Sequence, residues 1–455
     1  MRPTSNIFDT AARYCIYTVI FLAPWLHGAE QTWEQLFCSA VIFMAVVLVL
    51  AGKRPSLLPG KQAVWIIGLF GLWLVYCAFY LLPLPLDLIA ALSPANSGIT
   101  DSASPVRTHL TVYWQASFLA LCKYSALVAL FIVVITVFQG SDRMRQLAWV
   151  LVTSSGATAV YSQLNFLTHG QFEIVSAIPP WDFSWQEGIR GTFSYKNQYA
   201  LYLVMNICIT VGLLADALLQ RRKHRNISWT PVAILVIVLG LLLITLLNTS
   251  SRGALLSLLL GGGMTGLLLV RRNRSLTTRL FNKKVIAASV VALVVATAGF
   301  TQSSIYERFT SEKMADNGRA MLWQTAADVL VDYPVTGSGP GTYPYIQHQY
   351  KPLLLGNSQM SKRAHNDYLE TLATHGVLGA ALLLLPLFLL TITLLSTSLT
   401  ATSAGLLMGC QAAILAYLIQ AAFDVNAGVF LLPVLFILLL GTGWNIVRQS
   451  RQQIC

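Results

Sequence analysis

Residues 231–253 read PVAILVIVLGLLLITLLNTSSRG and contain two features that decide the architecture of this chain. Residues 231–247 are almost entirely apolar, and the run is long enough for a helix to cross a bilayer. A short polar segment follows, and Arg252 then stands at the start of the next apolar run. The sequence therefore predicts two consecutive membrane-spanning helices with a guanidinium at the beginning of the second.

The same apolar pattern recurs along all 455 residues, of which 55% are hydrophobic and 11% charged, with a mean hydropathy of +0.63. Long apolar blocks of this kind are typical of polytopic membrane proteins. We predict an all-α membrane protein with about twelve transmembrane helices. The predicted spans are Ala11–Leu26, Trp33–Ala51, Ala63–Leu81, Trp114–Phe138, Leu147–Phe166, Gln198–Leu219, Pro231–Leu247, Gly253–Val270, Val285–Phe300, Leu372–Leu395, Ala404–Ala422 and Val429–Val447.

The distribution of charge predicts the orientation. The two termini, through Arg13 at the first, and the segments around 52–62, 139–146, 216–230 and 271–284 hold 19 Lys/Arg against 3 Asp/Glu, whereas the rest holds 11 against 15. By the positive-inside rule the first set, including both termini, is cytoplasmic. The net charge of +12 then reflects orientation and contact with membrane lipids, and it does not indicate nucleic-acid binding.

Four regions follow from this topology: 1–150 with the first four spans and the start of the fifth, 151–300 with spans five to nine, an outer-face loop subdomain at 301–370, and 371–455 with the last three spans. Within the loop, Asn317–Val331 has apolar residues at helical spacing and predicts an amphipathic helix lying on the bundle. The glycine-rich segment 337–342 is interpreted as a plain turn, with a phosphate cradle as the alternative.

Basic groups lie at three helix starts on the predicted outer face, where positive charge should be rare: Arg190 with Lys196, Arg252, and His365. A helix start presents unpaired N–H groups and the positive end of the dipole, so an added guanidinium is unfavourable unless an anion binds there. Arginine also offers a bidentate fork suited to phosphate. Alternatively, the arginines extend to lipid headgroups or pair with loop carboxylates, the candidates being Glu187, Glu307 and Asp316.

Side chains near these starts have more specific expectations. Ser194 is predicted to cap the span that follows it, as is Ser250 or Ser251 before Arg252. A helix start disfavours a charged imidazole and nearby carboxylates favour one, so His365 is expected to be neutral near pH 7 and able to accept a proton. The alternative for His365 is a purely structural hydrogen bond. Lys123, deep within a span, either reaches an anionic group or pairs inside the bundle.

An ordered set of motifs resembles the O-antigen ligase and polymerase superfamily of bacterial inner membranes. The resemblance covers about residues 150–440. It rests on Arg190-Gly191-Thr192-Phe193 with Asn197 and Ala200, Ser251-Arg252-Gly253-Ala254, Arg319 and Trp323 with Tyr333-Pro334, and His365-Asn366-Asp367-Tyr368-Leu369-Glu370 with His375-Gly376.

The resemblance implies a GT-C-like bundle with a large periplasmic loop before the tenth span. It also implies a glycosyltransferase, needing neither metal nor cofactor, that passes a glycan from undecaprenyl diphosphate to an acceptor hydroxyl of lipid A-core with inversion. On this basis Arg190 and Arg252 are predicted to stabilise the diphosphate, and His365 is predicted to be the base. The predicted substrate-binding residues are Arg319, Lys196, Asn197, Asn366, Tyr368 and Lys123.

Two other functions stay open. A polymerase would join the glycan to a second carrier-linked glycan. Its usual marker is an Arg followed eleven residues later by Gly in outer loops. Arg252 and Gly263 have this spacing only inside a span, whereas Arg190 and Arg319 are followed at that spacing by leucine. This favours the ligase. A transporter or flippase is the alternative from a different class, and it is disfavoured because the polar residues gather at the outer face rather than near the midplane.

Overall fold

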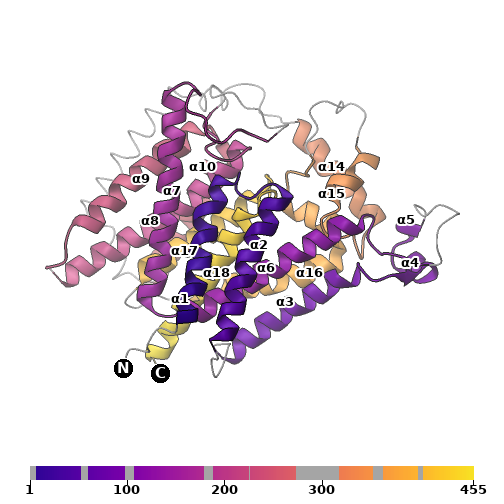
Figure 1. Cartoon of the computed structure of the whole chain (residues 1–455), viewed down its shortest axis with the longest axis horizontal. Helices are drawn as coiled ribbons and strands as arrows, with labels where there is room; N and C mark the ends of the chain where they lie inside the picture. Colours follow the sequence, from indigo (N-terminus) through magenta and orange to yellow (C-terminus); the bar gives the residue numbers. More distant parts are fainter. Residues whose placement is uncertain are drawn as a thin grey trace.

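The computed structural model describes residues 7–52, 60–97, 107–178, 188–224, 226–272, 317–351, 362–397 and 403–454, which are predominantly helical (Figure 1). Strands β1 (Leu84–Pro85) and β2 (Arg107–Thr108) form a short antiparallel pair. The helices are α1 (Ile7–Leu22), η1 (Ala23–Trp25), α2 (Thr32–Ala51), α3 (Lys61–Phe79), α4 (Leu86–Leu92), α5 (Pro94–Ser97), α6 (Trp114–Val137), α7 (Ser141–Leu167), α8 (Lys196–Lys223), α9 (Thr230–Asn248), α10 (Arg252–Arg272), α14 (Asn317–Asp332), α15 (Tyr343–Ile346), η4 (Gln347–Gln349), α16 (Asp367–Ser396), α17 (Ala404–Gln420) and α18 (Leu431–Ile454).

The predicted spans coincide with helices, apart from Val285–Phe300, which lies outside the described residues. Among the residues described, eight helices are long and apolar enough to cross a membrane: α2, α3, α6, α8, α9, α10, α16 and α18. The prediction of an all-helical, multi-pass membrane protein is therefore confirmed, while the total of twelve crossings stays a prediction.

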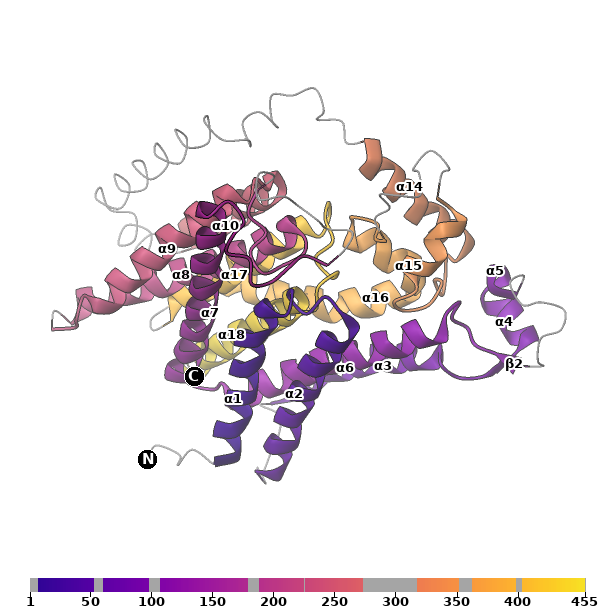
Figure 2. The ribbon, with the colours of Figure 1, turned by 45° about the horizontal axis from the view of Figure 1, so that its top comes forward.

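The bundle has a buried centre and an apolar outer surface. α8 packs on α17, which also contacts α10 and α18, and α18 contacts α6. In both views α17 and α18 lie between the α1–α6 side and the α7–α10 side (Figures 1 and 2). α8 and α18 are the most buried of the candidate spans, whereas α3 and α9 expose rows of apolar side chains. Such a surface requires an apolar solvent, as expected for helices that face lipid.

Small residues and one buried carboxylate fix α17 against α8. A Cβ atom at Gly409 would lie 2.7 Å from the carbonyl oxygen of Cys208, so the two backbones touch at this point. The Asp216 carboxylate, on α8, accepts the N–H groups of Gly405 at 2.7 Å and Leu406 at 3.0 Å. These are N–H groups of the first turn of α17, which have no partner within their own helix. The interface therefore combines close packing with a cap supplied from a neighbouring helix.

α16 is broken at Gly376, where φ is 63°. The turn after α14 fills the break: Ser338 N donates to Ala373 O at 3.0 Å, Gly339 N to Thr374 O at 2.9 Å, and Val377 N to Pro334 O at 2.9 Å. The N–H groups of Ser338 and Gly339 are thus used within the fold and are not turned toward a phosphate. The prediction of a plain turn is confirmed, and a break of this kind is tolerated because the inserted segment satisfies the freed backbone groups.

The predicted amphipathic helix is α14, which runs one residue beyond the predicted end. It buries Leu322, Ala326 and Val329 and packs on α16. With α15 it forms a small cluster at one end of the bundle, visible at the upper right of Figure 1. This packing places α14 beside the start of α16, where the predicted site residues gather.

The close approach of α8 and α17 gives a test of the fold. Gly409→Ala should destabilise the protein by about 1–3 kcal/mol, because the added methyl group collides with backbone that cannot move aside. Gly262→Ala, in α10, meets nothing within 4 Å and should be neutral or stabilising by up to about 1 kcal/mol, because alanine favours helix. Unfolding of the two variants in mixed micelles would measure both effects, and equal shifts would contradict the proposed packing.

Candidate functional site

His365 lies directly before the cap of α16 and faces a carboxylate from the turn between α17 and α18. Its Nδ1 is 3.4 Å from Oδ1 of Asp424, and both side chains are buried. The contact is longer than a formed hydrogen bond, and Nδ1 has no other partner among the described residues. Catalytic hydrogen bonds are often this loose without substrate and shorten in the reacting complex. The arrangement is a histidine–carboxylate pair.

Asp424 is held in place from two directions. Its Oδ1 accepts the N–H of Val425 at 2.8 Å, and its Oδ2 accepts Nδ2 of Asn197 at 2.8 Å. Asn197 Nδ2 also donates to the Tyr195 hydroxyl at 2.7 Å, and Gln420 donates to the Asn197 carbonyl at 3.2 Å. Asn197, a predicted substrate-binding residue, therefore orients the carboxylate opposite His365.

Two side chains of α14 join this pair. Trp323 Nε1 donates to the His365 carbonyl at 3.1 Å, and Arg319 hydrogen-bonds the Tyr195 hydroxyl. The Tyr195 ring stands edge-on to the His365 imidazole, with centroids 6.0 Å apart. Burial, together with the Asp424 carboxylate, raises the pKa of Tyr195 above its usual range, so this phenol keeps its proton. The structure thus brings Arg319, Asn197 and His365 together.

The loop arginine Arg190 is engaged by its own loop. Its guanidinium binds the carboxylate of Glu173, donates to Val175 O at 3.0 Å and donates to Phe193 O at 2.8 Å. The alternative considered for Arg190, an ion pair with a loop carboxylate, is thus found with Glu173. The carboxylates named as candidates for this pairing lie outside the described residues. Arg190 fixes the course of the loop that leads into α8.

The two arginine segments lie against each other. Ile189 N donates to Asn248 O at 2.8 Å, and a Cβ atom at Gly188 would lie 2.8 Å from Thr249 O. These contacts place the segment before α8 against the end of α9, four residues before Arg252. Arg252 is the first residue of α10, and the Ser251 hydroxyl accepts the N–H of Ala254 at 3.4 Å. The predicted cap before Arg252 is confirmed for Ser251.

The structure assigns local contacts to the remaining predicted residues. Lys196, the first residue of α8, is buried. The cap predicted for this helix is wrong: Tyr195 is the N-cap residue, and the Ser194 hydroxyl instead accepts the N–H of Ile178 at 3.0 Å. Asn366 caps α16 by accepting the N–H groups of Tyr368 at 3.1 Å and Leu369 at 3.0 Å. The Tyr368 hydroxyl donates to Leu418 O at 2.8 Å.

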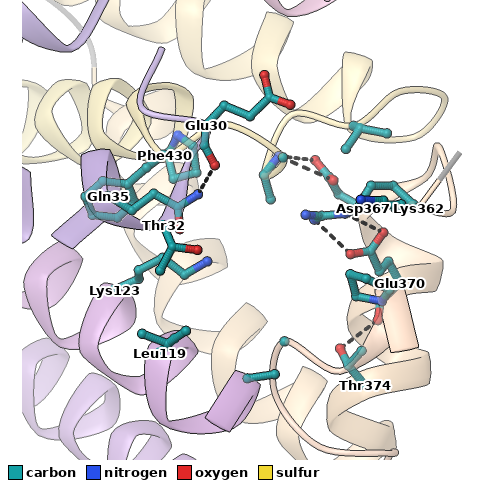
Figure 3. A pocket seen from close by; sticks show the side chains of 18 of the residues that line it. Glu30, Thr32, Gln35, Leu119, Lys123, Lys362, Asp367, Glu370, Thr374 and Phe430 are labelled. Atoms are coloured by element: carbon teal, nitrogen blue, oxygen red, sulfur yellow. Dashed lines mark hydrogen bonds and ion pairs between the residues drawn. The ribbon is translucent and has the colours of Figure 1, made fainter. Parts of the chain in front are cut away.

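A cavity of about 650 Å³ adjoins the pair formed by His365 and Asp424 (Figure 3). Residues from α2, α6, α16 and the segment after Asp424 line it, and Lys123, from α6, faces Asp367 and Glu370 across it.

Glu370 binds Arg363 through both carboxylate oxygens, with contacts of 3.1 Å to Nε and 2.8 Å to Nη2. Burial lowers the pKa of Arg363, but Glu370 and Asp367 outweigh it, so the pKa is raised and the guanidinium stays charged. Tyr195 is the wall shared by the cavity and His365.

Sequence reasoning missed Asp424, Tyr195 and Glu30 as members of this region. Asp424 stands just after an apolar span, in Asp424-Val425-Asn426, and a carboxylate at that position was the available signal. Nothing local indicates that it faces His365, since the two residues are far apart in the chain and come together only in the fold.

His27, in the turn between α1 and α2, ties two loops together. Its Nδ1 lies 2.9 Å from Glu34 Oε1 and its Nε2 lies 3.0 Å from Ser176 O. Both partners only accept hydrogen bonds, so both contacts are satisfied only by the doubly protonated, charged ring. The hydrogen bond to Glu34 raises the pKa of His27, against burial, which lowers it.

This raised pKa predicts a pH dependence of stability. The stabilisation from charged His27 should be fully present below the unfolded value of about 6.5 and should be lost as pH rises through the raised folded pKa. Melting temperatures between about pH 6 and 9 should therefore fall more steeply for the wild type than for His27→Asn, which tolerates the positive φ of this position. His348→Asn, at an exposed histidine of η4, should keep the wild-type slope. Parallel profiles for wild type and His27→Asn would refute the interpretation.

Comparison with known proteins gives one positive result. No curated protein matches the chain significantly. The sequence model of the family described as O-antigen ligase matches residues 235–384, which include Arg252, Arg319 and His365. The match ends before Asp424 and begins after Asn197, so the pairing of His365 with Asp424 is an observation of the fold alone. Residues 235–384 are thus similar to the O-antigen ligase family, in a chain with several helices long and apolar enough to cross a membrane.

Proposed function

We propose that the protein is a glycosyltransferase that acts at the periplasmic face of a bacterial inner membrane. It transfers a glycan from undecaprenyl diphosphate to an acceptor hydroxyl, as an O-antigen ligase joining O-antigen to lipid A-core in lipopolysaccharide synthesis. The family match supports the ligase or polymerase class. The positive-inside rule supports the orientation, since it assigns the more basic segments, and with them both termini, to the cytoplasm.

The observation that carries the mechanism is the buried pair of His365 and Asp424. An acceptor hydroxyl that attacks the anomeric carbon must lose its proton, and a neutral imidazole is suited to take it on Nε2. Asp424 would then hold the proton on Nδ1, fix the tautomer and stabilise the imidazolium that forms. The C–O bond to the diphosphate breaks as the new C–O bond forms on the opposite face, so the configuration inverts.

The leaving diphosphate needs positive charge and hydrogen-bond donors as it departs. We assign this role to Arg252 at the start of α10 and to Lys196 at the start of α8, where each helix adds its unpaired N–H groups. Arg190 supports them by holding the loop between Glu173 and Phe193 in place. Arg319 joins the site through Tyr195, next to the reacting groups. In this proposal the cationic side chains do the work that a divalent metal does in other transferases.

The pair formed by His365 and Asp424 predicts that substitutions at these two residues reduce the rate of glycan transfer to different extents. Purified protein would be reconstituted with an undecaprenyl-diphosphate glycan and with either lipid A-core or a second carrier-linked glycan. His365→Ala should abolish transfer, and Asp424→Asn should lower its rate about 100-fold or more, because general-base catalysis contributes about that much. His348→Ala, at an exposed histidine of η4, should retain the wild-type rate.

Wild-type transfer by His365→Ala would overturn this mechanism. The acceptor that supports turnover separates ligase from polymerase. Movement of the glycan across the membrane without bond transfer would instead establish the transporter class.

The phosphate role of Arg252 is tested by a substitution that keeps its charge. Arg252→Lys should lose most activity because lysine lacks the planar fork that binds phosphate through two parallel hydrogen bonds. Arg271→Lys, at the exposed far end of the same helix, is the matched control and should be fully active. The initial rate at saturating donor is the measurement, and full activity of Arg252→Lys would contradict the assignment.

A further inference from the structure

Three buried polar atoms that have no hydrogen-bond partner among the described residues belong to side chains lining the cavity shown in Figure 3. They are Glu30 Oε2, Gln198 Oε1 and His375 Nε2, which come from three different parts of the chain. Buried polar atoms are nearly always hydrogen-bonded, and leaving one unpaired is costly. Lining side chains that carry unsatisfied polar groups favour a ligand rich in hydrogen-bonding groups over a wholly apolar one.

Three cationic residues, Lys123, Lys362 and Arg363, and three acidic ones, Glu30, Asp367 and Glu370, line the cavity, so what it can bind depends on which charge is left without a partner. The Arg363 guanidinium is neutralised by Glu370, and the Asp367 carboxylate accepts the N–H groups of Asn426 at 3.0 Å and Ala427 at 3.2 Å. Lys123 is different, because its ammonium makes no hydrogen bond or ion pair with the described residues, although it faces the cavity from α6 (Figure 3). An ammonium at this depth is unfavourable without a counter-ion.

Glu30 is not a full counter-ion for the Lys123 ammonium. Burial raises the pKa of Glu30, and the hydrogen bond with Ser194 lowers it in part. A carboxyl group offers oxygen atoms that accept hydrogen bonds from sugar hydroxyl groups. The wall that contains Glu30 and Lys123 is therefore suited to a ligand with both hydroxyl groups and a negative charge.

Aromatic rings supply flat surfaces around the same space. Tyr124, Tyr195, Tyr345 and Phe430 line it. Tyr195 lies between the cavity and the His365 imidazole, so a sugar bound in the cavity would be one side chain away from the proposed base. The residues assigned to the diphosphate, Arg252 and Lys196, are not among the lining residues. The cavity is thus separate from the proposed donor groups.

We propose that this cavity is the acceptor subsite and that it binds a sugar carrying a carboxylate or a phosphate, with Lys123 as the counter-ion. The assignment of this cavity to the acceptor rests on the proposed function. Binding of an anionic sugar at Lys123 is an independent property of the cavity and is tested without any transfer reaction.

The experiment uses the full-length protein in nanodiscs and saturation-transfer NMR titrations with three sugars, galacturonate, glucose 6-phosphate and galactose, and it measures inorganic phosphate as a competitor of the bound sugar. At least one anionic sugar should bind about tenfold more tightly than galactose, as expected for one charge-assisted hydrogen bond. Lys123→Met should reduce its affinity to that of galactose. Lys61→Met, at the exposed first residue of α3, should leave it unchanged. Preference for galacturonate identifies a carboxylate ligand, and preference for glucose 6-phosphate identifies a phosphate ligand.

Two further variants keep the test decisive. Tyr345→Ala removes a half-exposed aromatic wall and should weaken all three sugars without unfolding the protein, so it tests the subsite even if Lys123→Met does not fold. His365→Ala should bind the anionic sugar normally while losing transfer, which separates failure of the mechanism from failure of the subsite. Equal affinity for neutral and anionic sugars, unchanged affinity in Lys123→Met, or inorganic phosphate binding as tightly as the sugar phosphate would overturn the proposal.

Discussion

The candidate site depends on the Asp367 carboxylate at the start of α16. It accepts the N–H groups of Asn426 and Ala427, while the Asp367 N–H donates to Ala421 O at 2.8 Å. These bonds lock the start of α16 to the turn that follows α17, and that turn carries Asp424. Removing a buried carboxylate with this many partners would leave several backbone groups unsatisfied, which is costly in a protein interior. The approach of His365 to Asp424 follows from this contact.

The same constraint explains the backbone at His365. With Asn366 fixed as the cap and Asp367 fixed to the turn, the chain reverses at His365, where φ is 51°. A left-handed conformation is unfavourable for a residue with a side chain, and it persists only where the surroundings determine it. Here Trp323 holds the His365 carbonyl, and Glu370 holds the N–H of Ala364 at 3.1 Å. The imidazole is therefore positioned by hydrogen bonds on both sides of its own residue.

The structural features that were predicted correctly are those that depend on residues close together in the sequence. Apolar runs predict spans because span length is a local property, and a serine cap before Arg252 was predicted because the residues that Ser251 caps follow directly. Ser194 failed as a cap because its hydroxyl is used by Ile178, which comes from the preceding loop. Asp424 was missed for the same reason, since its role depends on residues far away in the chain. Local chemistry alone does not show which distant group a loop side chain will meet.

Arg190 and Arg252 illustrate this limit, because both precede an apolar helix and look equivalent in the sequence. In the fold, Arg190 is enclosed by Glu173 and two carbonyl groups, whereas Arg252 begins its helix as the first residue. An enclosed guanidinium shapes a loop, and one at a helix start adds to an anion site. On the proposed function, the donor diphosphate therefore binds where α10 and α8 begin. The acceptor must then approach His365 from another direction, and the cavity beyond Tyr195 lies next to His365 without including those arginines.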